Sequence, residues 1–286
     1  MNAHFTAWRQ TSVVTLRALQ AGCHPKEVIA QLSEGLLAHY TSKPLIDLYG
    51  VYQHLMDYWA ETMQDDLYLI AADGWKAETS RIIEQDKKGK ERDAGWTCDL
   101  IPKALIVARY LSKEQAAFDQ LAAELEGVTA LITEMEEEHS GEDGAFSELD
   151  KVNKANVTAR QKEIKGEQNA THQAALLSDW RKLNSDQADL KKRLTEAETA
   201  IDAQAYAIYP RLTESEIQSL VTDGKWLSAL DAAIQGEMDR VSQQLTQRVK
   251  ELAERYETPL PQAAAKVTQL EEKVNQHLEK MGFSWN

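Results

Sequence analysis

The feature that most constrains this chain is a pair of apolar repeats between Phe118 and Ile201. In both repeats the apolar residues recur at alternating steps of three and four, a period of about 3.5 residues that is typical of helices supercoiled on a partner. The first repeat is Phe118, Leu121, Leu125, Val128, Ile132 and Met135, and the second is Leu176, Trp180, Leu183, Leu190, Leu194, Ala197 and Ile201. Residues 118–139 and 180–201 are equally long, as the two halves of an antiparallel hairpin would be. The pattern therefore predicts a coiled-coil arm.

Two polar residues occupy positions in these repeats. His139 takes the step after Met135, and Gln187 fills the gap between Leu183 and Leu190. A lone polar residue in a coiled-coil seam fixes the register of the two helices at some loss of stability. We therefore interpret His139 and Gln187 as register-setting residues.

The rest of the chain predicts an all-α fold, because strand-like alternation is almost absent and prolines are few. We expect a helical base formed by residues 1–111 and 203–286, with the arm inserted at residues 112–202. The arm should have a flexible acidic tip near residues 140–168, where glutamates, glycines and serines gather. Residues 87–92, a charged run, are expected to form an exposed loop or a frayed helix.

Local signals predict where several helices begin and end. Pro25 should start a helix, Ser112 should cap the first helix of the arm, and Thr213 with Glu216 fits a capping box. A short helix after Thr213 should stop at Gly224, and a long helix after that should be interrupted by prolines 259 and 261.

Charge and cysteine usage limit the classes of function. The formal net charge is −14, with 46 acidic against 32 basic residues, so the chain as a whole should repel phosphate and make little or no contact with DNA. Cys23 and Cys98 show no metal or redox spacing. No apolar run approaches the ~18–20 residues that a membrane helix needs, and the N-terminus lacks a signal-peptide pattern, so we expect a cytoplasmic protein.

The sequence contains little that predicts catalysis. Glu136 and His139 have the i, i+3 spacing of helical di-iron proteins, but those sites need the motif twice together with two further carboxylates. No nucleophile elbow, phosphate-binding loop or dinucleotide-binding glycine motif is present. We predict no catalytic, cofactor-binding or metal-binding residue, and a helical metalloenzyme remains a minor alternative.

Aromatic and apolar residues at the ends of elements are the best candidates for contacting a protein partner. Buried aromatic anchors dominate many interfaces, and seven tryptophans are many for a helical chain. The candidate partner-binding residues are Leu176, Trp180 and Leu183 in the second repeat, and Trp226, Phe283 and Trp285 elsewhere.

Several stretches of the sequence resemble a known family. They are DYWAETMQDD (57–66), ADGW (72–75), GWTCDLIPK (95–103), LTESEI (212–217) continuing to Lys225 and Trp226, and QRVKELAERY (247–256). These stretches are similar to the C-terminal region of the modification (methyltransferase) subunit of type I restriction-modification systems, and the resemblance covers nearly the whole chain.

That family implies DNA adenine N6-methylation with S-adenosylmethionine, by two modification subunits and one specificity subunit that a restriction subunit can join. The family's glycine-rich cofactor loop and its Asn-Pro-Pro-Phe/Tyr motif are both missing, since no two prolines are adjacent in this sequence. The resemblance thus implies a non-catalytic region that follows a methyltransferase domain, binds no S-adenosylmethionine itself, and docks the helical spacer of the specificity subunit.

A second interpretation does not use the resemblance. The chain could be a free-standing coiled-coil interaction protein that self-associates through the seam of residues 176–201 instead of folding back on itself.

Overall fold

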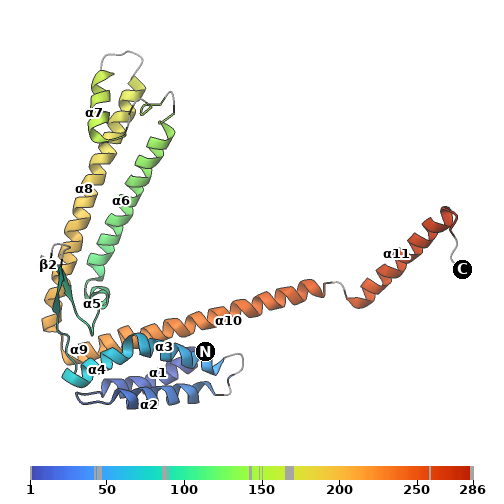
Figure 1. Cartoon of the computed structure of the whole chain (residues 1–286), viewed down its shortest axis with the longest axis horizontal. Helices are drawn as coiled ribbons and strands as arrows, with labels where there is room; N and C mark the ends of the chain where they lie inside the picture. The colour runs from blue at the N-terminus through green and yellow to red at the C-terminus, as the bar shows by residue number, and fades with distance from the viewer. Residues whose placement is uncertain are drawn as a thin grey trace. The chain divides into compact units, whose positions relative to one another are not determined.

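The computed structural model describes residues 2–41, 43, 47–85, 89, 91–141, 144–147, 149, 151–164, 171–257 and 259–283. The fold is all-α, as predicted: 78% of it is helical, and within the described residues the strands form only one two-stranded sheet. Figure 1 shows the helices in chain order from blue to red.

The chain forms two compact units, which we call the smaller and the larger unit. The smaller unit comprises residues 1–16, 24–64 and 226–286, and the larger unit comprises residues 17–23 and 65–225. This division differs from the predicted one, because residues 65–111 and 203–225, assigned to the base, belong to the same unit as the arm.

The smaller unit is built from helices throughout. They are α1 (Asn2–Arg17), α2 (Pro25–Tyr40), α3 (Leu48–Tyr58), a π-helical turn η1 (Trp59–Met63), α10 (Ser228–Arg255) and α11 (Leu260–Lys280). Pro25 starts α2 as predicted, and the Asp47 carboxylate caps α3 by accepting the Tyr49 N–H. Trp8 is buried and its indole N–H donates to the Leu32 carbonyl at 3.2 Å, which ties α1 to α2.

The larger unit contains all the remaining elements. They are α4 (Gln64–Asp73), β1 (Ser80–Gln85), β2 (Glu91–Thr97), α5 (Lys103–Tyr110), α6 (Ser112–Glu138), α7 (Lys154–Glu163), α8 (Thr171–Ile208), a 3₁₀ turn η2 (Tyr209–Arg211), α9 (Glu214–Ser219) and a π-helix η3 (Leu220–Leu227). The contacts that join residues 17–23 to this unit include two backbone-carbonyl hydrogen bonds: the Trp75 indole donates to the Leu19 carbonyl and the Gly22 N–H to the Ala71 carbonyl.

Helices α6 and α8 lie side by side and run antiparallel (Figure 1). Two hydrogen bonds show this direction. Trp180 of α8 contacts Glu136 of α6, and Gln187, seven residues later in α8, contacts Thr129, seven residues earlier in α6. The described positions of the two predicted repeats are buried or partly buried, with Leu190 and Ile201 buried in α8. Leu177 and Ala205, which lie outside the predicted repeat, are fully buried as well. The predicted hairpin pairing is therefore present, while supercoiling of the pair stays a prediction.

The tip of the arm contains a helix and a small core where the structure describes it, and its predicted flexibility stays a prediction. A small separate core joins Phe146 and Val157 to Ile132 of α6 and to Trp180 of α8. The N-terminus of α7 is capped by Asn153, whose side chain accepts the N–H groups of the two residues after Lys154. The apolar residues of this core come from α6, from the loop that contains Phe146, from α7 and its C-cap, and from α8.

Residues 80–85 and 91–97 form two antiparallel strands, which the sequence did not predict. Strand β1 pairs with β2 from Ser80 opposite Thr97 to Gln85 opposite Glu91, with an irregularity after Ile82. Gly95 has a φ of +114°, which favours glycine because it has no Cβ. Part of the charged run at 87–92 lies outside the described residues, and Glu91 and Arg92 are in β2 and not in a loop.

Among the boundaries predicted in the larger unit, the one at Thr213 is confirmed, and those at Ser112 and Gly224 are wrong. The capping box of Thr213 and Glu216 is present. Ser112 makes no capping hydrogen bond, because it is already the first residue of α6 and Leu111 holds the cap position. The helix after Thr213 does not stop at Gly224; it passes through η3, whose wider turns keep the backbone helical at that glycine, and continues as α10.

Candidate partner-binding surface

The predicted partner-binding residues fall into two groups. Trp180 and Trp226 are 2% and 0% exposed, so both are core residues and cannot contact a partner as predicted. Leu176 and Leu183 are partly buried against the small core at the tip of the arm. Phe283 is 59% exposed, and Trp285 lies outside the described residues. Of this set, Phe283 is the residue that a partner can reach.

The two predicted register residues have different surroundings in the structure. The Gln187 side chain donates to the Thr129 hydroxyl at 2.9 Å and accepts from Lys191 at 3.1 Å, so it links α8 to α6. His139 ends α6, and its carbonyl accepts the Phe146 N–H at 3.0 Å. Gln187 thus favours one alignment of the two helices, while His139 contributes a backbone turn at the end of the seam.

Glu136 has a structural partner inside the arm. Its carboxylate accepts a hydrogen bond from the Trp180 indole N–H at 2.8 Å, which satisfies a buried donor. Among the described residues no group of three His, Cys, Asp or Glu side chains is arranged to hold a metal ion. The spacing of Glu136 and His139 therefore has an explanation in the packing of the arm.

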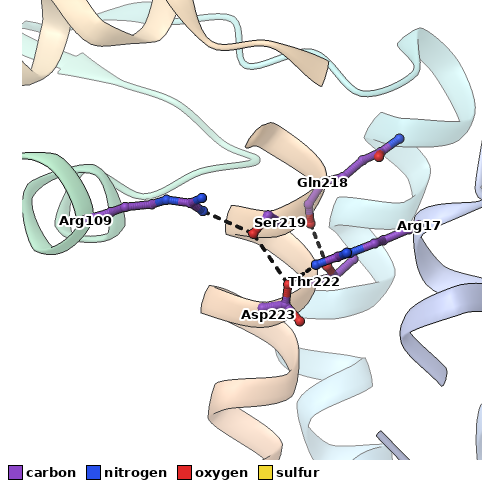
Figure 2. A network of polar contacts seen from close by, with 6 residues as sticks. All are labelled: Arg17, Arg109, Gln218, Ser219, Thr222 and Asp223. Carbon is purple, nitrogen blue, oxygen red and sulfur yellow. Dashed lines mark hydrogen bonds and ion pairs between the residues drawn. The ribbon is translucent and has the colours of Figure 1, made fainter. Parts of the chain in front are cut away.

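A polar network lies at α9 and η3 in the larger unit (Figure 2). Asp223 forms an ion pair with Arg17 and accepts from the Ser219 hydroxyl at 3.5 Å, and Ser219 in turn accepts from Arg109 at 3.1 Å. The Thr222 hydroxyl donates back to a carbonyl of its own helix, as Figure 2 shows. Because Arg17, Arg109 and Asp223 are far apart in the sequence, this network holds three segments of the unit together.

A buried ion pair supports the same region. The Lys225 ammonium lies 2.7 Å from the Asp66 carboxylate and donates to the Leu100 carbonyl at 3.0 Å. Both side chains are nearly covered, with 11% and 4% of their surfaces exposed. A buried charge requires such a partner, so the pair joins α4, η3 and the segment before α5. Its role is structural.

The surface with the clearest capacity to bind a partner is an apolar stripe on α10. The N-terminal half of α10 buries Leu230 and Ile234, and the same face continues through Met238 and Val241 into solvent. The exposed members of the stripe are Leu245, Val249, Leu252 and Tyr256. They are 50%, 57%, 38% and 65% exposed, in that order.

The spacing of these residues places them on one face. At about 100° per residue, Val241 and the four exposed residues fall within an arc of about 80°. Arg248 and Arg255 line one edge of this arc; Arg248 also pairs with Glu251 at 3.0 Å, and the Arg255 guanidinium lies over the Tyr256 ring. The stripe is thus an apolar seam with a basic border, which suits an amphipathic helix that carries acids along the facing edge.

Helix α11 has a second exposed apolar face. Its described side chains include no buried residue, and Val267, Leu270 and Val274 are each more than half exposed. The helix ends in a Schellman motif, in which Gly282 has a φ of +85° and the N–H groups of Gly282 and Phe283 donate to the Glu279 and Leu278 carbonyls. This motif explains why the chain leaves the helix at Gly282.

The sequence shows both apolar stripes but not their exposure. The period of the α10 residues is about 3.7, close to that of a straight helix, which equally predicts a helix packed on a core. The distinguishing signal was the density of charge around residues 245–256, together with the two prolines that end the element. A helix surrounded by charged residues and ended by prolines has few neighbouring elements that could cover its apolar face.

No helix in the described part of the chain combines the length and the apolar character needed to cross a bilayer. The chain matches no protein-family model, no curated protein and no solved structure.

Proposed function

We propose that this chain is the non-catalytic C-terminal assembly region of a type I modification subunit. In this proposal it docks the helical spacer of the specificity subunit and positions the methyltransferase domain that would precede it. The parent subunit would use S-adenosylmethionine, while this chain would bind none. A second modification subunit and a restriction subunit would complete a cytoplasmic complex, and DNA contact through this region would be minor or absent.

The observation that carries the proposal is the exposed stripe of Leu245, Val249, Leu252 and Tyr256. Four large apolar side chains on one helical face are the form that helix-in-groove and helix-pairing interfaces take. The stretch QRVKELAERY, which carries part of the family resemblance, contains Val249, Leu252 and Tyr256. The resemblance and the exposed surface therefore coincide on the same residues.

The rival function, self-association through residues 176–201, needs the α8 seam to be free. In the structure Trp180, Leu190 and Ile201 of that seam are buried, and α8 packs against α6. Separating the two helices would expose these side chains to water at about 1.5–3 kcal/mol each. No feature of the arm favours that rearrangement.

Calorimetric titration of the chain with the specificity subunit tests the proposal. We expect tight binding by the unmodified chain and a loss of roughly 100-fold or more for the double variant Leu245→Glu and Leu252→Glu, since two central contacts of ~2 kcal/mol each are removed. Because both side chains are exposed, thermal unfolding should be unchanged.

The matched control places the same charges on the opposite face of α10. Gln243→Glu with Gln247→Glu lies about 160–200° around the helix from Leu245 and should bind like the unmodified chain. A parallel titration with S-adenosylmethionine should show no binding. Equal affinity of both double variants for the specificity subunit would contradict the proposal, as would cofactor binding by the chain alone.

A further inference from the structure

Helix α11 differs from α10 in the period of its apolar face. Written as a heptad from Leu260, its a positions are Leu260, Val267, Val274 and Met281, and its d positions are Ala263, Leu270 and His277. This is a period of about 3.5 residues, which stays on one face only when the helix supercoils on a second helix. The exposed fractions of Val267, Leu270 and Val274 are 54%, 52% and 56%, so this face is open to a partner.

The residue types of the central turns, Val267 and Val274 at a and Leu270 at d, favour a pair of parallel helices. Valine at a combined with leucine at d favours two parallel strands, because the β-branched side chain suits the a layer of such a dimer. The heptad begins at the first residue of α11 and fills its 21 residues three times. The full length of the helix is therefore available for pairing.

The charges beside the seam indicate the same orientation. Lys266, Lys273 and Lys280 occupy the g positions, and Glu271 occupies an e position. In a parallel pair the g residue of one helix faces the e residue of the next heptad in the partner, so Lys266 meets Glu271 twice by symmetry. An antiparallel pair of identical helices would set g against g and bring lysines together, which is unfavourable.

The surface of α11 also has a hollow whose lining residues could receive a leucine side chain of a second helix. It is lined by Val267, Leu270, Glu271 and Val274, with Asn275 at its border. The first four are consecutive a, d, e and a positions, the set that receives a d-position side chain in a parallel, in-register pair. Leu270 of a second copy is the side chain that would enter it.

We propose that two copies of this chain join through a parallel, in-register coiled coil of their α11 helices. His277 then forms a polar layer at a d position, which fixes the register and weakens the pair. This inference uses α11 and not the α10 stripe, so it does not rest on the proposed docking of the specificity subunit.

Disulfide trapping tests the orientation directly. In the full chain carrying Cys23→Ser and Cys98→Ala, identical a positions of a parallel pair face each other, so Val274→Cys should form a covalent dimer on mild oxidation. Gln276→Cys, on the outer face of the same helix, is the matched control and should stay monomeric. No dimer from Val274→Cys, or equal trapping at both positions, would overturn the proposal.

Sedimentation equilibrium of variants with reversed charges at Lys266 and Glu271 tests the pairing in solution. Lys266→Glu replaces two attractive contacts by two repulsive ones and should weaken the dimer about tenfold. Adding Glu271→Lys should restore it, and His277→Leu should tighten it at least about tenfold. A chain that stays monomeric at high micromolar concentration even with His277→Leu would refute the inference.

The two proposals can fail independently. Lys266→Glu leaves the α10 stripe intact and should not change the intrinsic affinity for the specificity subunit. Leu245→Glu with Leu252→Glu should abolish that binding and leave the dissociation constant of the α11 pair unchanged.

Discussion

Breaking the buried ion pair between Lys225 and Asp66 should be one of the most destabilising single changes in the larger unit. Lys225→Met keeps the aliphatic stem and removes the ammonium that lies against the Asp66 carboxylate, which is 4% exposed. The Leu100 carbonyl loses a donor at the same time. Removing one partner of a buried pair destabilises a protein by about 3–5 kcal/mol, because the remaining charge stays desolvated.

A matched control exists in the same unit. Lys103 pairs with Asp202 at 2.6 Å, but these side chains are 50% and 39% exposed. An exposed pair of this kind contributes about 0–1 kcal/mol, so Lys103→Met should have a small effect. The two lysine substitutions remove the same group, and the difference between them isolates the effect of burial.

Urea unfolding followed by tryptophan fluorescence measures both variants. With a slope of about 2 kcal/mol per molar urea, Lys225→Met should lower the unfolding midpoint by about 1.5–2.5 M and Lys103→Met by less than about 0.5 M. Combining Lys225→Met with Asp66→Leu should recover much of the loss, because the buried charge is then gone. Equal midpoints for Lys225→Met and Lys103→Met would refute the reasoning.

Three further predictions concern the same unit. Thr213→Ala should reduce the free energy of unfolding by about 1 kcal/mol through loss of the capping box, whereas Ser112→Ala, at a residue that caps nothing, should leave the urea midpoint unchanged. Trp180→Ala should lower the free energy of unfolding by about 3–5 kcal/mol, measured by urea unfolding, because it empties the small core at the tip of the arm. Burial alone would raise the pKa of Asp202, but the hydrogen bonds it accepts outweigh burial and hold the pKa below its usual range. Its stabilising effect is therefore present above the unfolded-state pKa of about 3.9 and is lost as pH falls through the lower folded-state value, so Asp202→Asn should lower the urea midpoint at pH 7 and not in strong acid.

Periodic features of the sequence predicted the structure best. The two repeats of the arm predicted the pairing of α6 with α8, and Gln187 could be recognised as a polar residue facing the other helix. These features are local in sequence and repeat many times, so the signal accumulates over several turns. Prolines 25 and 259 were equally informative, because their missing N–H groups restrict where a helix can begin.

Features that depend on distant contacts were not predicted. Strands β1 and β2 have a polar sequence without alternation, and their anchor is the hydrogen bond from the Trp96 indole to Asp202, which lies 106 residues away. The core at the tip of the arm joins single apolar residues from separate elements. Neither arrangement leaves a periodic trace in the sequence.

The sequence could not predict which of the candidate partner-binding residues are exposed to solvent. Trp180 and Trp226 have the composition of interface anchors, yet they are core residues, whereas Leu245 and Val249 look like core residues and are exposed. An amphipathic stripe indicates that a helix packs its apolar face against a neighbour. Whether that neighbour belongs to the same chain depends on the positions of all the other elements.

Hydrogen–deuterium exchange of the chain, with and without the specificity subunit, tests the central claim most directly. The account predicts that binding slows exchange in peptides covering residues 241–256 and leaves the exchange of α6 and α8 unchanged, because the α10 stripe becomes the buried face of an interface. Binding that protects the arm and not residues 241–256, or the absence of binding, would contradict it.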